Sequence, residues 1–198
     1  MIAPGQTLEN PVTGERFTFT HTAASSGGEL LAFDFALRPG GAVPMPHVHP
    51  VQTERFEVVD GLVRFRVGLR TRMARPGDVV EVAPGVAHSF ANAGPGEALL
   101  RVEVRPALAM EDMFAEVVAL AQAGRMTRRG MPRSPLDLAV LARKYDQEAH
   151  APLLGVRLQR LLLAPLVFLA RTQRHRTVAG SSRSSMPSKS HGATPACR

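Results

Sequence analysis

The chain has 198 residues, 44% of them hydrophobic and 21% charged, which suits one domain with a buried core plus appendages. Its single cysteine, Cys197, excludes a disulfide framework within the chain, and no basic stretch followed by an apolar one opens the sequence, so we expect a cytoplasmic protein. The net charge of +7 is uneven: residues 1–105 hold ten Arg against eleven Asp and Glu, whereas residues 106–198 hold fourteen Lys and Arg against six acids.

Short alternating segments bounded by Gly, Pro and Asn dominate the first half of the chain. They cover residues 15–22, 29–37, 54–59, 62–69, 79–82 and 98–104. Such a rhythm of short strands predicts an all-β sandwich or barrel, and no comparable helical period occurs before about residue 108.

Two histidines, His47 and His49, stand two positions apart between the second and third of these segments. On an extended strand both imidazoles leave the same face and can converge on one cation. Glu54 follows closely, and His88 adds a third imidazole downstream. Three neutral imidazoles and one carboxylate suit a first-row divalent metal, and they leave one or two coordination positions open for chemistry.

The spacing around these residues resembles the two motifs of the cupin superfamily, Gly-x5-His-x-His-x3-4-Glu-x6-Gly and Gly-x5-Pro-x-Gly-x2-His-x3-Asn. The matching positions are Gly41, His47, His49, Glu54 and Gly61, then Gly77, Gly85, His88 and Asn92, with Ala83 at the proline position and Pro84 beside it. Fifteen residues separate Gly61 from Gly77, a spacing similar to that of compact single-domain cupins.

The resemblance covers roughly residues 5–105 and implies a small RmlC-like jelly-roll barrel. It also implies that His47, His49, Glu54 and His88 hold one divalent transition metal, which would be Fe, Mn, Zn, Ni or Cu.

Strand parity predicts which side chains share the barrel interior with the metal. The expected pocket residues are Met45, Gln52, Phe56, Phe65, Phe90 and Asn92. Gln52 and Asn92 have the alternative of making structural hydrogen bonds at the lip and in a turn. Arg64, Arg66 and Arg101 take the opposite parity, so the interior is expected to be apolar and to hold no fixed cation.

An interior of this kind disfavours the cupins that isomerise sugar phosphates or nucleotide sugars, because those need cationic or tyrosyl groups inside the barrel. The resemblance instead implies a metalloenzyme for an apolar or aromatic small molecule, either dioxygenase-like or polyketide-cyclase-like, with Glu54 as the catalytic residue. The competing function is a non-catalytic module that binds a small ligand or a metal. The ligand set alone does not choose between them.

Helices are predicted after the barrel. Residues 109–123 place apolar side chains at helical spacing and end at Gly124, and Ser134-Pro135 opens a second helix that continues towards His150. In a third segment, 153–174, the longest charge-free run has ten residues, which is too short to span a membrane. Its wide apolar face requires a cover, and we expect packing on the barrel or across a homodimer, with peripheral contact to an anionic membrane as the alternative.

The sequence therefore predicts three parts: a cupin β-barrel over 1–105, a helical extension over 106–176, and a basic, Ser-rich tail over 177–198 that should be disordered. The expected partner is a small-molecule ligand. No specific nucleic acid is expected, because the chain has no Trp, one Tyr and no recognisable stacking platform among its arginines.

Overall fold

The computed structural model describes residues 2–43, 45–152 and 155–181, with the side chains of the last helix described as far as Thr172. Within these ranges nine strands precede three helices. The strands are β1 Thr7–Glu9, β2 Arg16–His21, β3 Leu31–Leu37, β4 Thr53–Asp60, β5 Val63–Val67, β6 Arg70–Ala74, β7 Val79–Val82, β8 His88–Asn92 and β9 Ala98–Arg105. The helices are α1 Met110–Gln122, α2 Pro135–Lys144 and α3 Val156–Ser181.

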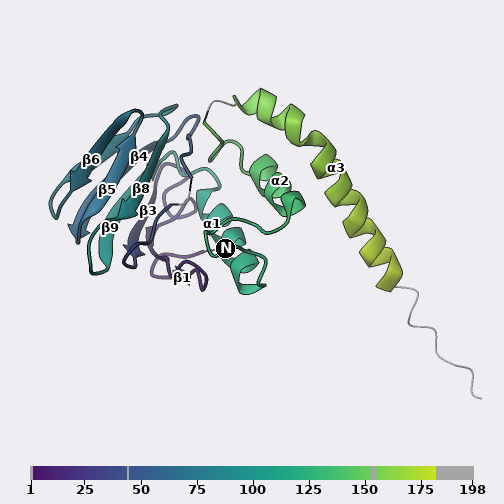
Figure 1. Cartoon of the computed structure of the whole chain (residues 1–198), viewed down its shortest axis with the longest axis horizontal. Coiled ribbons are helices and arrows are strands. Elements are labelled where there is room, and N and C mark those ends of the chain that lie inside the picture. Colours follow the sequence, from purple (N-terminus) through teal and green to yellow (C-terminus); the bar gives the residue numbers. More distant parts are fainter. Residues whose placement is uncertain (1, 44, 153–154, 182–198) are drawn as a thin grey trace, which may run out of the picture.

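The strands form two antiparallel sheets. One has the order β1-β2-β3-β9-β4-β7 and the other the order β6-β5-β8 (Figure 1). The chain before β4 runs beside β8, with isolated bridges from Ala42 to Ala91 and from His47 to His88. Strand β9 inserts between β3 and β4, which are consecutive in the chain, as the crossing connections of a jelly roll require. The predicted all-β barrel with a C-terminal helical extension is confirmed.

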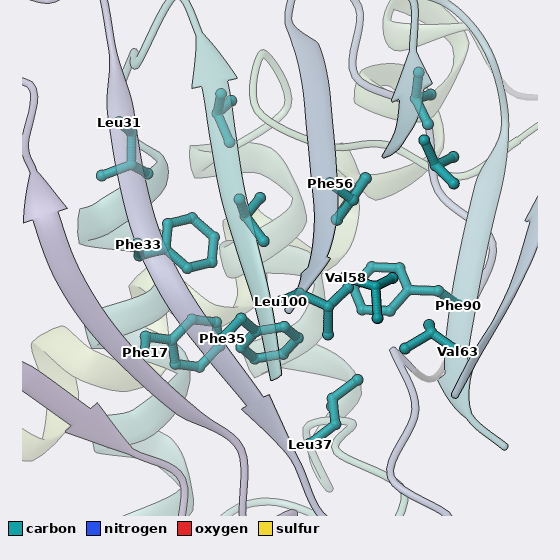
Figure 2. Packing of buried hydrophobic residues seen from close by; sticks show 14 of the residues in the cluster. Phe17, Leu31, Phe33, Phe35, Leu37, Phe56, Val58, Val63, Phe90 and Leu100 are labelled. Carbon is teal, nitrogen blue, oxygen red and sulfur yellow. The ribbon is translucent and has the colours of Figure 1, made fainter. Parts of the chain in front are cut away.

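Phenylalanine rings pack among aliphatic side chains in the core between the sheets (Figure 2). The ring of Phe56 lies 5.3 Å from that of Phe65 and 5.0 Å from that of Phe90, in tilted arrangements that aromatic pairs favour. Alternation is clear on β9, where every second residue is buried. The opposite face of the smaller sheet exposes Arg64 and Arg66, as strand parity predicts. Burial of the apolar side chains on the inward faces of the two sheets holds the sheets together.

At two motif positions a side chain would clash with the backbone, so glycine is required there. Gly61 follows β4 at a φ of +84°, and a Cβ there would lie 2.8 Å from Cα of Ala98, closer than real contacts allow. A Cβ on Gly41 would lie 2.9 Å from the carbonyl oxygen of Arg38. Both positions therefore serve the barrel's backbone, not the ligand set.

Three strands escaped the sequence analysis. β1 is short and lies at a sheet edge, and β6 is exposed except for Ala74, so its sequence has no apolar alternation to detect. β8 was not predicted as a strand, and the sequence analysis considered it only through the parity of its residues with His88. A two-residue turn at Gly68 and Leu69 joins β5 to β6, within a segment that the sequence presented as one strand.

Helix α1 closes the barrel beside the larger sheet. The ring of Phe114 stacks on Phe17 at 4.6 Å and meets Phe33 edge-on at 5.4 Å, while Met110 is 1% exposed within the core cluster. The buried carboxylate of Glu111 accepts a hydrogen bond from the backbone N–H of Ala23 at 2.8 Å. The apolar stripe predicted for residues 109–123 is therefore part of the barrel core.

Helix α2 begins where the sequence predicts, with the Ser134 hydroxyl accepting from the N–H of Leu136 at 3.2 Å. It ends at Lys144, short of His150, because residues 145–150 turn back towards the barrel.

Helix α3 packs on the side of α2 away from the sheets (Figure 1). Of the two covers predicted for segment 153–174, packing on the barrel is not observed for the described part of that segment, because α3 packs on α2 instead, and packing across a homodimer stays a prediction. The helix continues past Thr177 to Ser181, and the rest of the expected tail, 182–198, lies outside the described residues. No helix among the described residues is long and apolar enough to cross a membrane.

Asn92, at the end of β8, supports a prediction about stability. Its buried Nδ2 lies 2.9, 3.1 and 2.8 Å from the carbonyl oxygens of Leu37, Arg38 and Gly96, and its Oδ1 accepts from the N–H of Gly94. Replacing Asn92 by Ala should lower the free energy of unfolding by about 1–3 kcal/mol, because buried carbonyls lose their donors. Urea unfolding measures this, and metal content per folded molecule should not change. Loss of metal at unchanged stability would contradict this structural role.

Candidate metal centre

Four side chains from both sheets meet inside the barrel. Glu54 projects inward from β4 of the larger sheet, with Phe56 and Val58 on the same face. His88 opens β8 of the smaller sheet, and reciprocal backbone hydrogen bonds of 3.1 and 3.0 Å place His47 beside it. One ligand atom from each of His47, His49, Glu54 and His88 lies within 4.8 Å of every other. The structure thus brings together all four residues that the sequence selected.

The histidines are held at their second ring nitrogens. Nδ1 of His47 lies 3.2 Å from the carbonyl oxygen of Met45, and Nδ1 of His88 lies 3.3 Å from that of Val86. Nδ1 of His49 contacts the carbonyl oxygen of Glu148. A carbonyl only accepts, so each contact places a proton on Nδ1 and leaves Nε2 as the nitrogen available to a metal.

The residues present fit a bound metal. Nε2 of His88 lies 2.8 Å and Nε2 of His49 lies 3.1 Å from Oε2 of Glu54. The His49 contact is close, but its geometry is not that of a hydrogen bond, so this buried nitrogen has no hydrogen-bond partner among the described residues. A buried nitrogen without a partner, facing a carboxylate and two further imidazoles, has the donor set that first-row divalent metals prefer.

The charges of the cluster are also suited to a cation. Burial raises the pKa of Glu54, but the attraction of His49 and the contacts with His49 and His88 outweigh burial and hold that pKa well below its usual range. Burial, reinforced by His88, lowers the pKa of His47 to about 4, so this imidazole is neutral at pH 7. Burial opposes protonation of His49, but the negative charge of Glu54 and the contacts with Glu54 and the Glu148 carbonyl together outweigh it, and the pKa of His49 is raised.

The helical extension also contributes to this centre, and the sequence analysis did not anticipate that contribution. The backbone N–H and C=O of Val48 pair with the C=O and N–H of His150, both at 3.0 Å. This backbone pairing therefore holds the residue between His47 and His49 against a segment of the helical extension. The Glu148 side chain fixes that segment in turn, because its Oε1 accepts from the N–H of Ala109 at 3.1 Å.

A cavity of about 290 Å³ adjoins the cluster, at the lower end of the size range of small-molecule sites. Its walls come from both sheets, from α1 and from the segments around residues 130 and 149. The lining is mostly apolar: Phe17, Phe33, Phe35, Val43, Met45, Phe56, Phe90, Val102, Met110, Met113, Phe114, Val117, Gly130, Met131 and Ala149, with Asn10, Glu15, His47, His49 and Glu54 as its polar members.

The residues predicted for the pocket divide into two groups. Met45, Phe56 and Phe90 line the cavity, and Met45 lies at its rim with 48% of its surface exposed. Phe65 is fully buried in the core, behind the cavity wall. Gln52 and Asn92 make structural hydrogen bonds instead, with Nε2 of Gln52 donating to the carbonyls of Pro106 and Ala107 at 3.0 and 3.2 Å.

The polar cavity residues Asn10 and Glu15 were not anticipated. Both precede β2, and burial is the main cause of a raised pKa for Glu15. The inward parity of Phe17 and Phe19 extends back to Glu15, and this was the one signal that could have found it. The sequence analysis recognised the amphipathic face of α1, but it did not predict that this face covers the cavity and the barrel core.

The fold and the site together define a small β-barrel protein with a buried His3Glu cluster beside an apolar cavity. The family model for the cupin domain matches residues 33–104, a range that includes the whole cluster. Residues 33–104 of the chain therefore form a cupin domain. No curated protein sequence matches the chain significantly.

Similar solved structures include an RmlC-like cupin from Shewanella frigidimarina, with 21% identity, a TM-score of 0.46, and coverage of 56% of this chain and 94% of that one. A predicted oxalate decarboxylase from Thermotoga maritima has 18% identity, a TM-score of 0.46, and coverage of 54% and 99%. KdgF from Halomonas sp. has 18% identity, a TM-score of 0.45, and coverage of 53% and 90%. Likeness at this level does not extend to activity or ligand.

The first prediction for this site concerns metal content. Replacing His49 by Ala removes one of four ligands and should reduce bound metal sharply, while the apolar core keeps the barrel folded. Replacing the exposed His21 by Ala is the matched control and should change nothing. Elemental analysis of protein purified without a metal-affinity tag compares the three forms. Equal metal content in wild type and His49→Ala would refute the ligand assignment.

A second prediction follows from the raised pKa of His49. A metal must displace the proton from this ring, so proton competition persists above the ordinary histidine pKa of 6.5. The affinity for Zn²⁺ should therefore keep rising with pH above 6.5, by at most about tenfold per pH unit for one displaced proton. Chelator competition at a series of pH values measures it. An affinity that is constant above pH 6.5 would contradict the expectation.

Proposed function

We propose that the protein is a metalloenzyme whose cupin barrel binds one divalent transition metal at His47, His49, Glu54 and His88 and acts on an apolar or aromatic small molecule. The observation that carries the proposal is the cavity, which shares His47, His49 and Glu54 with the cluster and is otherwise lined mainly by Phe, Met and Val side chains. A ligand in that cavity would lie directly beside the metal position.

The bound metal would supply Lewis-acid polarisation of a ligand oxygen or, if it is redox-active, activation of dioxygen. The chain's own residues would do the rest. Phe56 and Phe90 would hold an aromatic ring by stacking or edge contacts, and Met45 at the rim would adapt to its shape. Glu54, ionised at neutral pH, would serve as the anionic ligand and as the nearest acceptor for a proton from the substrate.

The absence of cations weighs against phosphorylated substrates. No Lys, Arg or Tyr among the described residues lines the cavity, so apart from the metal a phosphate would find no cationic partner among the side chains there. The same lining supports a ligand that makes apolar contacts along most of its length and presents one oxygen to the cluster.

A substitution in the cavity tests this. Val117 lines it from α1, and Val117→Trp should fill part of the space and weaken ligand binding at least tenfold, about 1.4 kcal/mol. Ala119→Trp places the same side chain at an exposed position of the same helix and should bind normally. Calorimetry with the metal-loaded protein would use flavonols and aromatic polyketides, with sugar phosphates as the opposing class. Metal content should be equal in all forms.

The outcomes separate three functions. Binding of an aromatic compound followed by its conversion, detected by mass spectrometry and oxygen uptake, supports the enzyme. Binding without conversion at any metal that the site accepts supports a non-catalytic binding module instead. Binding of sugar phosphates in preference to the aromatic panel would refute the proposed substrate class.

A further inference from the structure

One face of α3 leaves large apolar side chains in solvent. The exposed fractions are 47% for Leu158, 70% for Leu161, 55% for Leu162, 70% for Phe168 and 47% for Leu169. These positions recur at helical spacing, and the exposed Pro165 falls among them. We name this set, with Pro165, the α3 apolar face. A contiguous strip of this kind is unusual on a soluble surface and marks a binding site.

The opposite side of α3 is already anchored. Arg160 donates two hydrogen bonds to the buried Asp146, at 2.6 and 2.7 Å, and the side chain of Gln159 accepts from the N–H of Ala151. Ala170 is buried near α2. These contacts fix the rotation of the helix and leave the α3 apolar face in solvent.

The charges around this face have one sign. Arg157 and Arg171 lie along one flank of the helix, and neither forms an ion pair with any described residue. From residue 151 onwards the chain has eight Lys and Arg and no acid. A second copy of α3 set against this face would therefore bring cations towards cations and offer no carboxylate to either.

We infer that the α3 apolar face is a docking surface for an anionic lipid bilayer. The helix would lie in the plane of the interface, with its leucines and Phe168 below the headgroups and the flanking arginines among them. Long arginine side chains suit this position because their stems are apolar and their heads reach the phosphates. The barrel, on the far side of α2, would remain in water with its cavity clear of the membrane.

The test uses the full chain and phosphatidylcholine vesicles with and without phosphatidylserine. The wild-type protein should sediment with the mixed vesicles, and added salt should weaken the binding. The double variant Leu161→Ser with Phe168→Ser should lose at least tenfold in partition coefficient. Arg157→Gln with Arg171→Gln should lose about fivefold per charge, on mixed vesicles only. Leu69→Ser, which removes a leucine that is 96% exposed on the distant β5–β6 turn, is the matched control and should bind normally.

A fluorescence measurement reports the depth of this face. Because the chain has no Trp, Phe168→Trp introduces a single reporter, and its emission should shift to the blue on mixed vesicles, whereas that of Leu69→Trp should not. Circular dichroism verifies that all variants are folded. Failure of the wild type to bind mixed vesicles overturns the inference, as does binding that survives Leu161→Ser with Phe168→Ser. A dimer that this double variant dissociates, without vesicle binding, assigns the face to a second copy and also overturns it.

Discussion

A buried carboxylate in an apolar barrel is the constraint around which this structure is organised. Glu54 is 6% exposed, and Phe56 and Val58 follow it along the inward face of β4. An isolated ionised carboxylate in such a place would be very costly, so it requires donors or a cation at close range. His49 and His88 supply contacts from the facing side of the barrel. The histidines therefore compensate for the cost of burying the ionised carboxylate of Glu54 in the apolar core.

The arrangement also explains why the motif residues serve different purposes. Gly41 and Gly61 are needed where the backbone has no room for a side chain, and Asn92 holds loop carbonyls together at the end of β8. Such residues recur at fixed spacing with the ligands because they shape the barrel that presents them. Motif spacing alone therefore identifies both the metal ligands and the residues that shape the barrel, and it cannot tell the two apart.

Sequence reasoning recovered the parts of the fold that depend on local periodicity. The inward faces of β3, β4 and β9, the first helix and the start of the second follow from alternation, apolar spacing and capping. The four cluster residues followed from spacing that matches a known family. Strand β6 was missed because an exposed edge strand has no apolar pattern, and Phe65 was misplaced because parity distinguishes inward from outward but not cavity from core.

The contacts between the helical extension and the barrel had no local signal at all. α1 lines the cavity, α2 separates α3 from the sheets, and residues 145–150 return to the segment before β4 that carries His47 and His49. Each depends on which surface an amphipathic segment finds, and several surfaces of similar hydrophobicity were available. The uncovered face of α3 shows that even a strong apolar pattern does not predict burial within the same chain.

The contact between His49 and the carbonyl of Glu148 joins residues that are 99 positions apart, and it imposes an order of assembly. Without residue 148 in place, the His49 ring lacks the contact that orients it. Completion of the centre then waits for the extension to return. By thermodynamic reciprocity, a cation that prefers the oriented ring stabilises the returned segment by the same free energy. Loading of the centre and closure of the C-terminal half on the barrel are thus thermodynamically coupled.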